Sequence, residues 1–472
     1  MKRVLALFLA FVFIAAMSLA ACNSGNTPAA APPSDNGGSS ASDNSGGTVS
    51  ATELVVKGSQ SDLQKDSIVI RGVRPLTGMN TYAEETAFGA CYKMWVDLTN
   101  QSGGVYVKSL DRKVPIDCQV YDDGSDITKT TQLFEQVLAN EKPDIILGPS
   151  STAATFACSP IAQKYDYLFL SAEGGAKELE KYIVDNPNTF VTLSYSATQV
   201  PALIKIFDEL GVKSVYCVYV DDLHGTEYWG ATKPLLDAAG IETKGFQSVP
   251  LTGGFDGDAI VTAARNSGAQ AFLCYTYPDQ GIPITLSAVA LDYNPDVFLL
   301  GPGVSYDFFA SAVFGDLGSA GLEGCMGWGA WNTKSSAAAA QFNTDFQNYW
   351  IQKGLWWKNA DGSDNPNAKV YQDWWGMACY ISVTEVLQQC IENAGQIDAN
   401  GILDQDTLVK YCGSADFNTV LNPKLHYTNN VLSDDMYLGN VGQWQKGIYE
   451  VVDNDARRTA DPIYPKPAWP KN

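Results

Sequence analysis

The chain contains very little histidine and far fewer basic than acidic side chains. Of its 472 residues two are histidine, and 31 Lys and Arg stand against 52 Asp and Glu, a formal net charge of −21. A surface this acidic repels nucleic-acid phosphates, so we expect no nucleic-acid partner. Two histidines exclude a histidine-rich metal site, and we predict neither a metal nor a cofactor.

Several short catalytic signatures are also missing. The sequence has no GxSxG elbow, no P-loop, no HExxH and no dinucleotide glycine fingerprint after the first predicted strand. A serine hydrolase built from Ser150, His224 and Asp221 stays open as an alternative, although nothing in the sequence activates Ser150. We therefore predict no catalytic residues and do not expect an enzyme.

The N-terminus has the pattern of a secretion signal. Lys2 and Arg3 precede an apolar run over residues 4–17 that is too short to be a good membrane span. The signal ends in LAAC, residues 19–22, which resembles a bacterial lipobox with Cys22 as its lipidated residue. We predict a signal peptide over 1–21 and a mature protein that is lipid-anchored outside the cytoplasm, at the bacterial cell membrane.

The segment after Cys22 is rich in Ser, Gly, Asn, Ala and Pro as far as about residue 52, and cannot bury enough apolar surface to fold. We interpret residues 22–65 as the lipidated cysteine and a flexible tether. Nine cysteines follow, an odd number without a CxxC. Cys217 and Cys274 lie in apolar runs typical of buried thiols, so we do not base the fold on disulfides.

From residue 67 onward, predicted strands alternate with predicted helices. Such alternation implies right-handed βαβ units and parallel sheets. The pattern restarts near residue 198 and runs to Leu300, which indicates two α/β lobes in succession. Long helices are then expected over 337–353 and 371–394, in a part of the chain that can cross between the lobes.

The stretch Asp144–Gln163, DIILGPSSTAATFACSPIAQ, has the pattern of a ligand site. A short apolar strand ends at Gly148-Pro149, and Ser150, Ser151 and Thr152 follow at the start of an alanine-rich helix. The free N–H groups of a helix start favour an anionic or carbonyl oxygen, and ligands collect at the carboxyl ends of strands. The alternative is that Ser150 only caps the helix.

Eight segments in order resemble a known family: RPLTGMNTYAEETAFGA, VYDDGSD, DIILGPSSTAA, YLFLSAEGGAKEL, DDLHGTEYW, AFLCYTYPDQ, FLLGPGVSYDFF and GQWQKGIYEV. They are similar to type I periplasmic solute-binding proteins of the branched-chain amino-acid, amide and urea group, the extracellular receptors of ABC importers. The resemblance implies an α/β fold of two Rossmann-like lobes with parallel sheets, joined by a multi-crossover hinge. We expect lobe 1 over 66–194 and 324–425, and lobe 2 over 195–323 and 426–472.

The resemblance also implies a site in the cleft between the lobes. Ser150–Thr152 would hold a ligand carboxylate or an equivalent oxygen. The two acids that bind an ammonium group in the family match Ser196 and Gly303, and Glu173 or Asp307 could replace that charge. The predicted ligand-binding residues are Tyr82, Ser150, Ser151, Thr152, Glu173, Gly174, Gly175, Tyr195, Ser196, His224, Tyr275, Gly303 and Asp307.

These features together predict a monomeric substrate-binding lipoprotein of an ABC importer, with a small solute and the permease and ATPase subunits as partners. A plain branched-chain amino acid is not expected, because a desolvated ammonium group needs a charge partner. Tyrosines near strand ends, among them Tyr82, Tyr195, Tyr275 and Tyr306, favour an aromatic or other organic acid, or an amide. The alternative is a ligand-sensing domain for a signalling partner.

Overall fold

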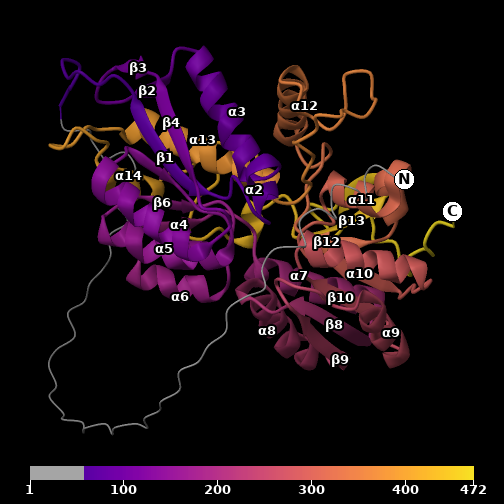
Figure 1. The fold of residues 1–472 in the computed structure, drawn as a ribbon. Coiled ribbons are helices and arrows are strands. Elements are labelled where there is room, and N and C mark those ends of the chain that lie inside the picture. Colours follow the sequence, from indigo (N-terminus) through magenta and orange to yellow (C-terminus); the bar gives the residue numbers. More distant parts are fainter. Residues whose placement is uncertain (1–57, 472) are drawn as a thin grey trace, which may run out of the picture. The chain divides into compact units, whose positions relative to one another are not determined.

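The computed structural model describes residues 58–471 (Figure 1). The predicted signal peptide, Cys22 and most of the predicted tether lie outside these residues. Within the described range, no helix is both long and apolar enough to cross a membrane. All nine cysteines of this range are free thiols, and eight of them are buried.

The first lobe is built on parallel strands. Its three-stranded sheet has the order β4-β1-β5, and β6 and β7 form a second parallel pair. A separate two-stranded hairpin, β2 and β3, is antiparallel. These strands are β1 (Ile68–Arg74), β2 (Val105–Val107), β3 (Arg112–Val114), β4 (Ile116–Asp122), β5 (Ile145–Leu147), β6 (Phe169–Ser171) and β7 (Thr189–Val191).

The second lobe has one seven-stranded sheet of order β14-β13-β12-β11-β10-β8-β9. The strands from β12 to β9 are parallel, while β13 pairs antiparallel with both β12 and β14. Its strands are β8 (Ser214–Val220), β9 (Glu242–Val249), β10 (Ala271–Tyr275), β11 (Val297–Leu300), β12 (Met326–Trp328), β13 (Val441–Gln445) and β14 (Ile448–Val451).

Helices cover both sheets. Figure 1 shows α4, α5 and α6 side by side next to the first sheet. The helices up to the hinge are α2 (Thr81–Glu85), α3 (Phe88–Gln101), α4 (Ile127–Gln136, continued by the π-helix η2, Val137–Glu141), α5 (Thr152–Lys164) and α6 (Glu178–Asp185). Those after it are α7 (Ser196–Leu210), α8 (Leu223–Ala238), α9 (Gly257–Ser267), α10 (Pro278–Ala290), α11 (Asp307–Phe314), η3 (Gly315–Leu322), α12 (Ala337–Gln352), α13 (Met377–Ala394), α14 (Gln405–Cys412) and η4 (Asp434–Met436).

Strand β10 shows why its sequence is apolar throughout. Phe272 and Cys274 lie in the core on one face of the sheet, and Ala271, Leu273 and Tyr275 lie in the core on the other. A parallel strand covered by helices on both faces buries every side chain, so it reads as a continuous apolar run. The predicted α/β fold with two lobes and mostly parallel sheets is confirmed.

Local contacts determine where several helices begin and end. The segment after β1 forms two helices, α2 and α3, because the chain folds back so closely that a Cβ on Gly89 would lie 2.1 Å from the Glu84 carbonyl oxygen. Helix α8 begins at Leu223, because Asp222 caps it by accepting the Gly225 N–H at 2.9 Å. Helix α13 begins at Met377 instead of the predicted 371, since residues 371–376 lie against the second lobe, where Asp373 bridges to Tyr306.

The lobe boundaries expected at 324 and 426 are too early in the chain. Strand β12 pairs with β11 and β13, so the chain is still in the second lobe at Trp328. Later, Tyr427 and Tyr437 are buried in the core of the first lobe. The two crossings run side by side, with the Gly329 N–H donating to the Asn440 carbonyl at 2.6 Å. A third crossing joins β7 to α7.

Candidate functional site

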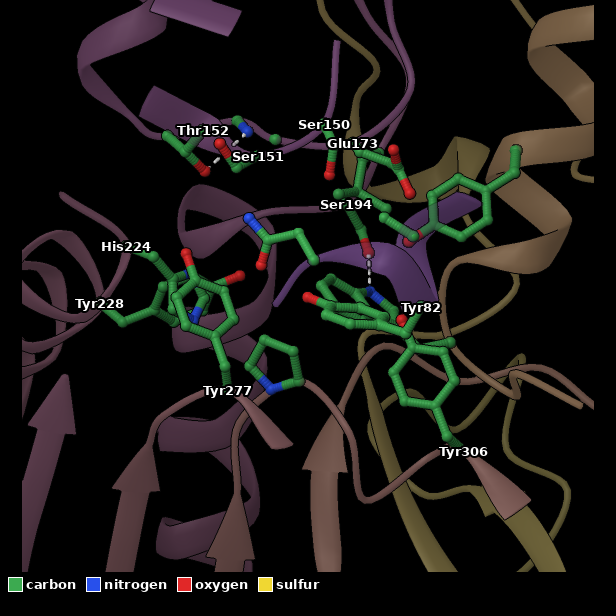
Figure 2. Close-up of a pocket in the computed structure, with 18 residues that line it drawn as sticks. Tyr82, Ser150, Ser151, Thr152, Glu173, Ser194, His224, Tyr228, Tyr277 and Tyr306 are labelled. Carbon is green, nitrogen blue, oxygen red and sulfur yellow. Dashed lines mark hydrogen bonds between the residues drawn. The ribbon is translucent and has the colours of Figure 1, made fainter. Parts of the chain in front are cut away.

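A cleft lined by 18 residues lies between the loops that follow the parallel strands of the two lobes (Figure 2). It leaves about 590 Å³ free of protein atoms, including its open mouth. Eight of the thirteen predicted ligand-binding residues line it: Tyr82, Ser150, Ser151, Thr152, Glu173, Gly174, Gly175 and His224.

The start of α5 presents hydroxyl groups to this cleft. Ser151 is the cap of the helix, with its Oγ accepting the Ala154 N–H at 3.3 Å. Its backbone has φ 81° and ψ 156°, a region that is essentially reserved for glycine and costs on the order of 1–3 kcal/mol. Such strain is found mainly at functional sites. The alternative that Ser150 caps the helix is wrong, because Ser151 has that role.

The loop after β6 is pressed against the start of α5. A Cβ on Gly174, which has φ 120°, would lie 2.6 Å from the Ser151 carbonyl oxygen. The Gly175 N–H donates to Thr152 Oγ1 at 3.4 Å, and Thr155 Oγ1 donates to the Glu173 carbonyl at 3.2 Å. The two loops therefore form one rigid wall of the cleft.

Glu173 carries the carboxylate of this wall, but it already has a cationic partner. Arg74, fully buried, pairs with Glu173 and with Glu84, the latter at 2.6 Å, and donates to the Gly148 carbonyl at 2.8 Å. Burial raises the pKa of Glu173, and the charge of Arg74 opposes that shift. Burial by itself would lower the pKa of Arg74, but Glu173 and Glu84 raise it above its ordinary value.

Two aromatic groups face each other across the cleft. Figure 2 shows His224, Tyr228 and Tyr277 on one side and Tyr82 and Tyr306 on the other, with Ser150–Thr152 and Glu173 along the top. The His224 ring lies 5.1 Å from that of Tyr277 and 4.6 Å from that of Tyr228. The Tyr82 and Tyr306 rings are 6.0 Å apart in an edge-on arrangement.

His224 brings an unused polar atom to the site. The residue is 6% exposed, and its Nε2 has no hydrogen-bond partner. Burial lowers its pKa to about 4, although nearby Asp222 acts in the opposite direction. The ring is therefore neutral at pH 7, and its Nε2 is a buried polar atom beside the cleft. Because this nitrogen makes no bond to Ser150 or Asp221, the relay that a Ser-His-Asp hydrolase requires is not formed.

Two of the predicted residues lie behind the cleft. Tyr195 donates to Glu180 at 2.8 Å and packs beside α6. Ser196 donates to Glu227 at 2.5 Å. Both hydroxyls are therefore engaged by carboxylates outside the cleft, and neither residue lines it.

Three more predicted residues are also absent from the lining of the cleft. Tyr275 is fully buried, with its hydroxyl 3.1 Å from that of Thr232. Gly303 has φ 119°, and a Cβ there would lie 2.8 Å from the Pro278 ring. Asp307 is half-buried and accepts the Trp374 indole N–H at 3.4 Å. Loss of hydration raises the pKa of its carboxyl group to about 7.

Ten lining residues were not among the thirteen predicted ligand-binding residues: Asn80, Ala83, Leu193, Ser194, Tyr228, Tyr277, Pro302, Tyr306, Trp375 and Tyr380. Tyr306 was predicted only as one of the tyrosines near strand ends that favour an aromatic ligand. Tyr277 and Tyr306 follow the ends of β10 and β11. Trp375 had no such signal. It reaches the cleft only because residues 371–376 extend to the second lobe, where Asp373 bridges to Tyr306, and its indole N–H donates to Ser194 Oγ at 3.1 Å.

Across residues 58–471, no group of three or more His, Cys, Asp and Glu side chains is placed to hold a metal ion. The site consists of hydroxyls, one paired carboxylate, a neutral imidazole and aromatic rings.

Comparison with known proteins shows one family and one fold. The family model described as periplasmic binding protein matches residues 68–447. A solute-binding protein of an ABC transporter from Rhodopseudomonas palustris, solved with 3,4-dihydroxybenzoic acid, is 14% identical, with a TM-score of 0.65 over 85% of this chain and 99% of that one. A leucine-binding protein from Thermotoga maritima is 16% identical, with a TM-score of 0.61 over 82% and 99%.

A third similar structure is the branched-chain amino-acid transporter substrate-binding protein of Streptococcus pneumoniae, solved with isoleucine. It is 14% identical, with a TM-score of 0.61 over 84% of this chain and all of that one. These identities establish the fold that is shared and leave the ligand of this chain open.

Proposed function

Because the chain belongs to the periplasmic binding protein family, whose members bind solutes outside the cytoplasm, we propose that it is the substrate-binding lipoprotein of an ABC importer. The LAAC sequence at Cys22 supports lipid anchoring, and the low-complexity segment after it supports a tether to the membrane. The permease and ATPase subunits of the importer would then be its protein partners, and the receptor would act as a monomer.

The observation that carries the proposal is the cleft itself. A hydroxyl-rich helix start faces two groups of aromatic rings, without a reactive residue between them. The N–H groups at the start of α5 favour a carboxylate or carbonyl oxygen. The facing rings favour a flat body, which stacks on them or meets their edges.

We propose an aromatic or other organic acid, or an amide, in preference to a branched-chain amino acid. Glu173 is the one carboxylate among the residues that line the cleft, and Arg74 already neutralises it. An ammonium group placed there without its own partner would cost several kcal/mol, on the order of the penalty for a buried unpaired charge. The relative solved with 3,4-dihydroxybenzoic acid supports this preference, whereas the relative solved with isoleucine represents the competing possibility.

The first test is mass spectrometry of the solute that co-purifies with the mature protein. Calorimetry then compares leucine, isoleucine and valine with benzoate, 3,4-dihydroxybenzoate and benzamide, on wild type and on Glu173→Gln. We expect binding of a ring-bearing acid or amide, with the ligand recovered unchanged. Micromolar binding of leucine that is lost in Glu173→Gln would show that Glu173 serves the ammonium group after all. Conversion of the ligand to product would contradict a binding protein.

A further inference from the structure

Behind the cleft, a buried carboxylate of the second lobe reaches a helix of the first. Glu227 on α8 is 7% exposed, and its Oε1 accepts the backbone N–H of Lys177 at 2.7 Å. Lys177 precedes the first residue of α6, so Glu227 caps this helix from the opposite lobe. The same oxygen accepts the Ser196 hydroxyl at 2.5 Å, a bond within the second lobe.

Glu227 also meets a second carboxyl group across the lobes. Glu178, the first residue of α6, is hydrogen-bonded to it through its own side chain. Two carboxylates can share such a bond only if one of them carries a proton. Burial, followed by the bond to Glu178, raises the pKa of Glu227 to about 7, while the bond to Glu227 lowers the pKa of Glu178.

We propose that Glu227 is an interlobe latch: its protonated side chain, bound to the N-terminus of α6 and to Glu178, holds the lobes closed, and its ionised form releases them. The latch lies outside the ligand cleft. It therefore changes the affinity for a solute through the closed population of the protein, whatever the solute is.

The bonds from Ser196 and from the Lys177 N–H favour the ionised form of Glu227, whereas burial and the bond to Glu178 favour the protonated form and outweigh them. Lys177 and Lys181 act on Glu178 and help to keep it ionised. Tyr195 and Tyr228 also face Glu227, and Tyr195 is itself bonded to Glu180. Once Glu227 ionises as well, the carboxylates of Glu178 and Glu227 repel each other across the lobes, and separation of the lobes relieves this repulsion.

The direction and size of the pH effect on lobe closure follow from proton linkage. In the structure, burial and Glu178 raise the pKa of Glu227 from 4.5 to about 7. Separation of the lobes that returns this pKa toward 4.5 makes closing take up a proton between these two values. The closed form is favoured below pH 7 and loses that advantage as the pH rises through 7. Between pH 6 and pH 9 the ratio of closed to open molecules should fall by up to about tenfold.

Pulsed electron–electron double resonance, which measures the distance between two spin labels, tests the latch directly on the ligand-free protein. Spin labels are attached to ketone-bearing amino acids at positions 184 on α6 and 238 on α8, which are both exposed, so native thiols stay untouched. We expect the short label distance of the closed lobes to dominate at pH 6 and a longer distance to grow at pH 9. An unchanged distance distribution in the wild type would overturn the proposal.

Three variants separate the latch from a general electrostatic effect. Glu227→Gln keeps an acceptor for Lys177 and a donor for Glu178, so the short distance should persist at both pH values. Glu227→Ala should show the longer distance at both. An exposed control on β9, Glu242→Gln, should retain the wild-type response. If Glu227→Gln behaves like Glu227→Ala, the proposal is wrong. Because no solute is used, neither outcome depends on the proposed ligand.

Discussion

Replacing Arg74 with Met should expose how the cleft wall is held together. Arg74 is the buried cation between Glu84 and Glu173. Without it, Glu84 keeps Lys93 at 2.9 Å, whereas the Glu173 carboxylate keeps only the Phe88 N–H at 3.4 Å. The variant therefore leaves one uncompensated charge at the cleft.

Removing one member of a buried ion pair costs about 3–5 kcal/mol, and we expect a loss of that order at pH 8. In the variant, burial without Arg74 raises the pKa of Glu173 further above its unfolded value. The lost stability is then recovered as the pH falls, since protonation removes the buried charge. One proton changes the free energy of unfolding by about 1.4 kcal/mol per pH unit, so up to about 2.7 kcal/mol should return between pH 8 and pH 6.

The assay is urea unfolding of wild type and variant at both pH values. Arg71→Met is the matched control on the same strand, because Arg71 also binds two carboxylates, Asp117 at 3.0 Å and Glu141 at 2.8 Å, but near the surface. It should cost about 1 kcal/mol or less without the pH effect. Adding Glu173→Gln to Arg74→Met should abolish the pH dependence. A deficit that is equal at pH 6 and 8 would refute this reasoning.

Three further changes test other parts of the chain. Ser151→Gly and Ser151→Ala both remove the cap and should weaken ligand binding. The glycine variant should be more stable than the alanine variant by about 1–3 kcal/mol and melt at a higher temperature, because φ 81° suits glycine. Equal melting temperatures would contradict strain at Ser151. Gly174→Ala should reduce the free energy of unfolding by about 1–3 kcal/mol more than Gly211→Ala. Both glycines have positive φ, but of the two only Gly174 has neighbouring backbone within reach of a Cβ. Similar losses of stability in thermal unfolding would count against close loop packing. Cys22→Ser should move the protein from the membrane to the soluble fraction with ligand affinity intact, and retention on membranes after fractionation would argue against lipidation.

Much of the fold could be predicted from local sequence. Strands β5, β8 and β10 coincide with the apolar runs before Gly148 and around Cys217 and Cys274, because continuous apolar runs between turn residues leave few alternatives for a buried strand. The hydroxyl-rich helix start was also recognisable, since strand, Gly-Pro and Ser-Ser-Thr are contiguous. For the same reason, most of the predicted residues that line the cleft come from two short loops.

Residues whose role depends on distant neighbours could not be predicted. Tyr275 and Tyr277 are two positions apart, yet the first is core and the second lines the cleft, because the strand ends between them. Glu173 has a charge that suits an ammonium group, but Arg74, 99 positions away, neutralises it. Trp375 reaches the site only because residues 371–376 extend to the second lobe.

The sequence by itself thus determined the two α/β lobes, the order of their strands along the chain and the loop at which a ligand oxygen is expected, since these depend on contiguous patterns of burial and turn residues. Only the tertiary structure decided which carboxylates are free, which aromatic rings face the cleft and where the lobes touch. Those properties arise from pairs of residues far apart in the chain, such as Lys177 and Glu227, whose contact depends on how the whole chain packs.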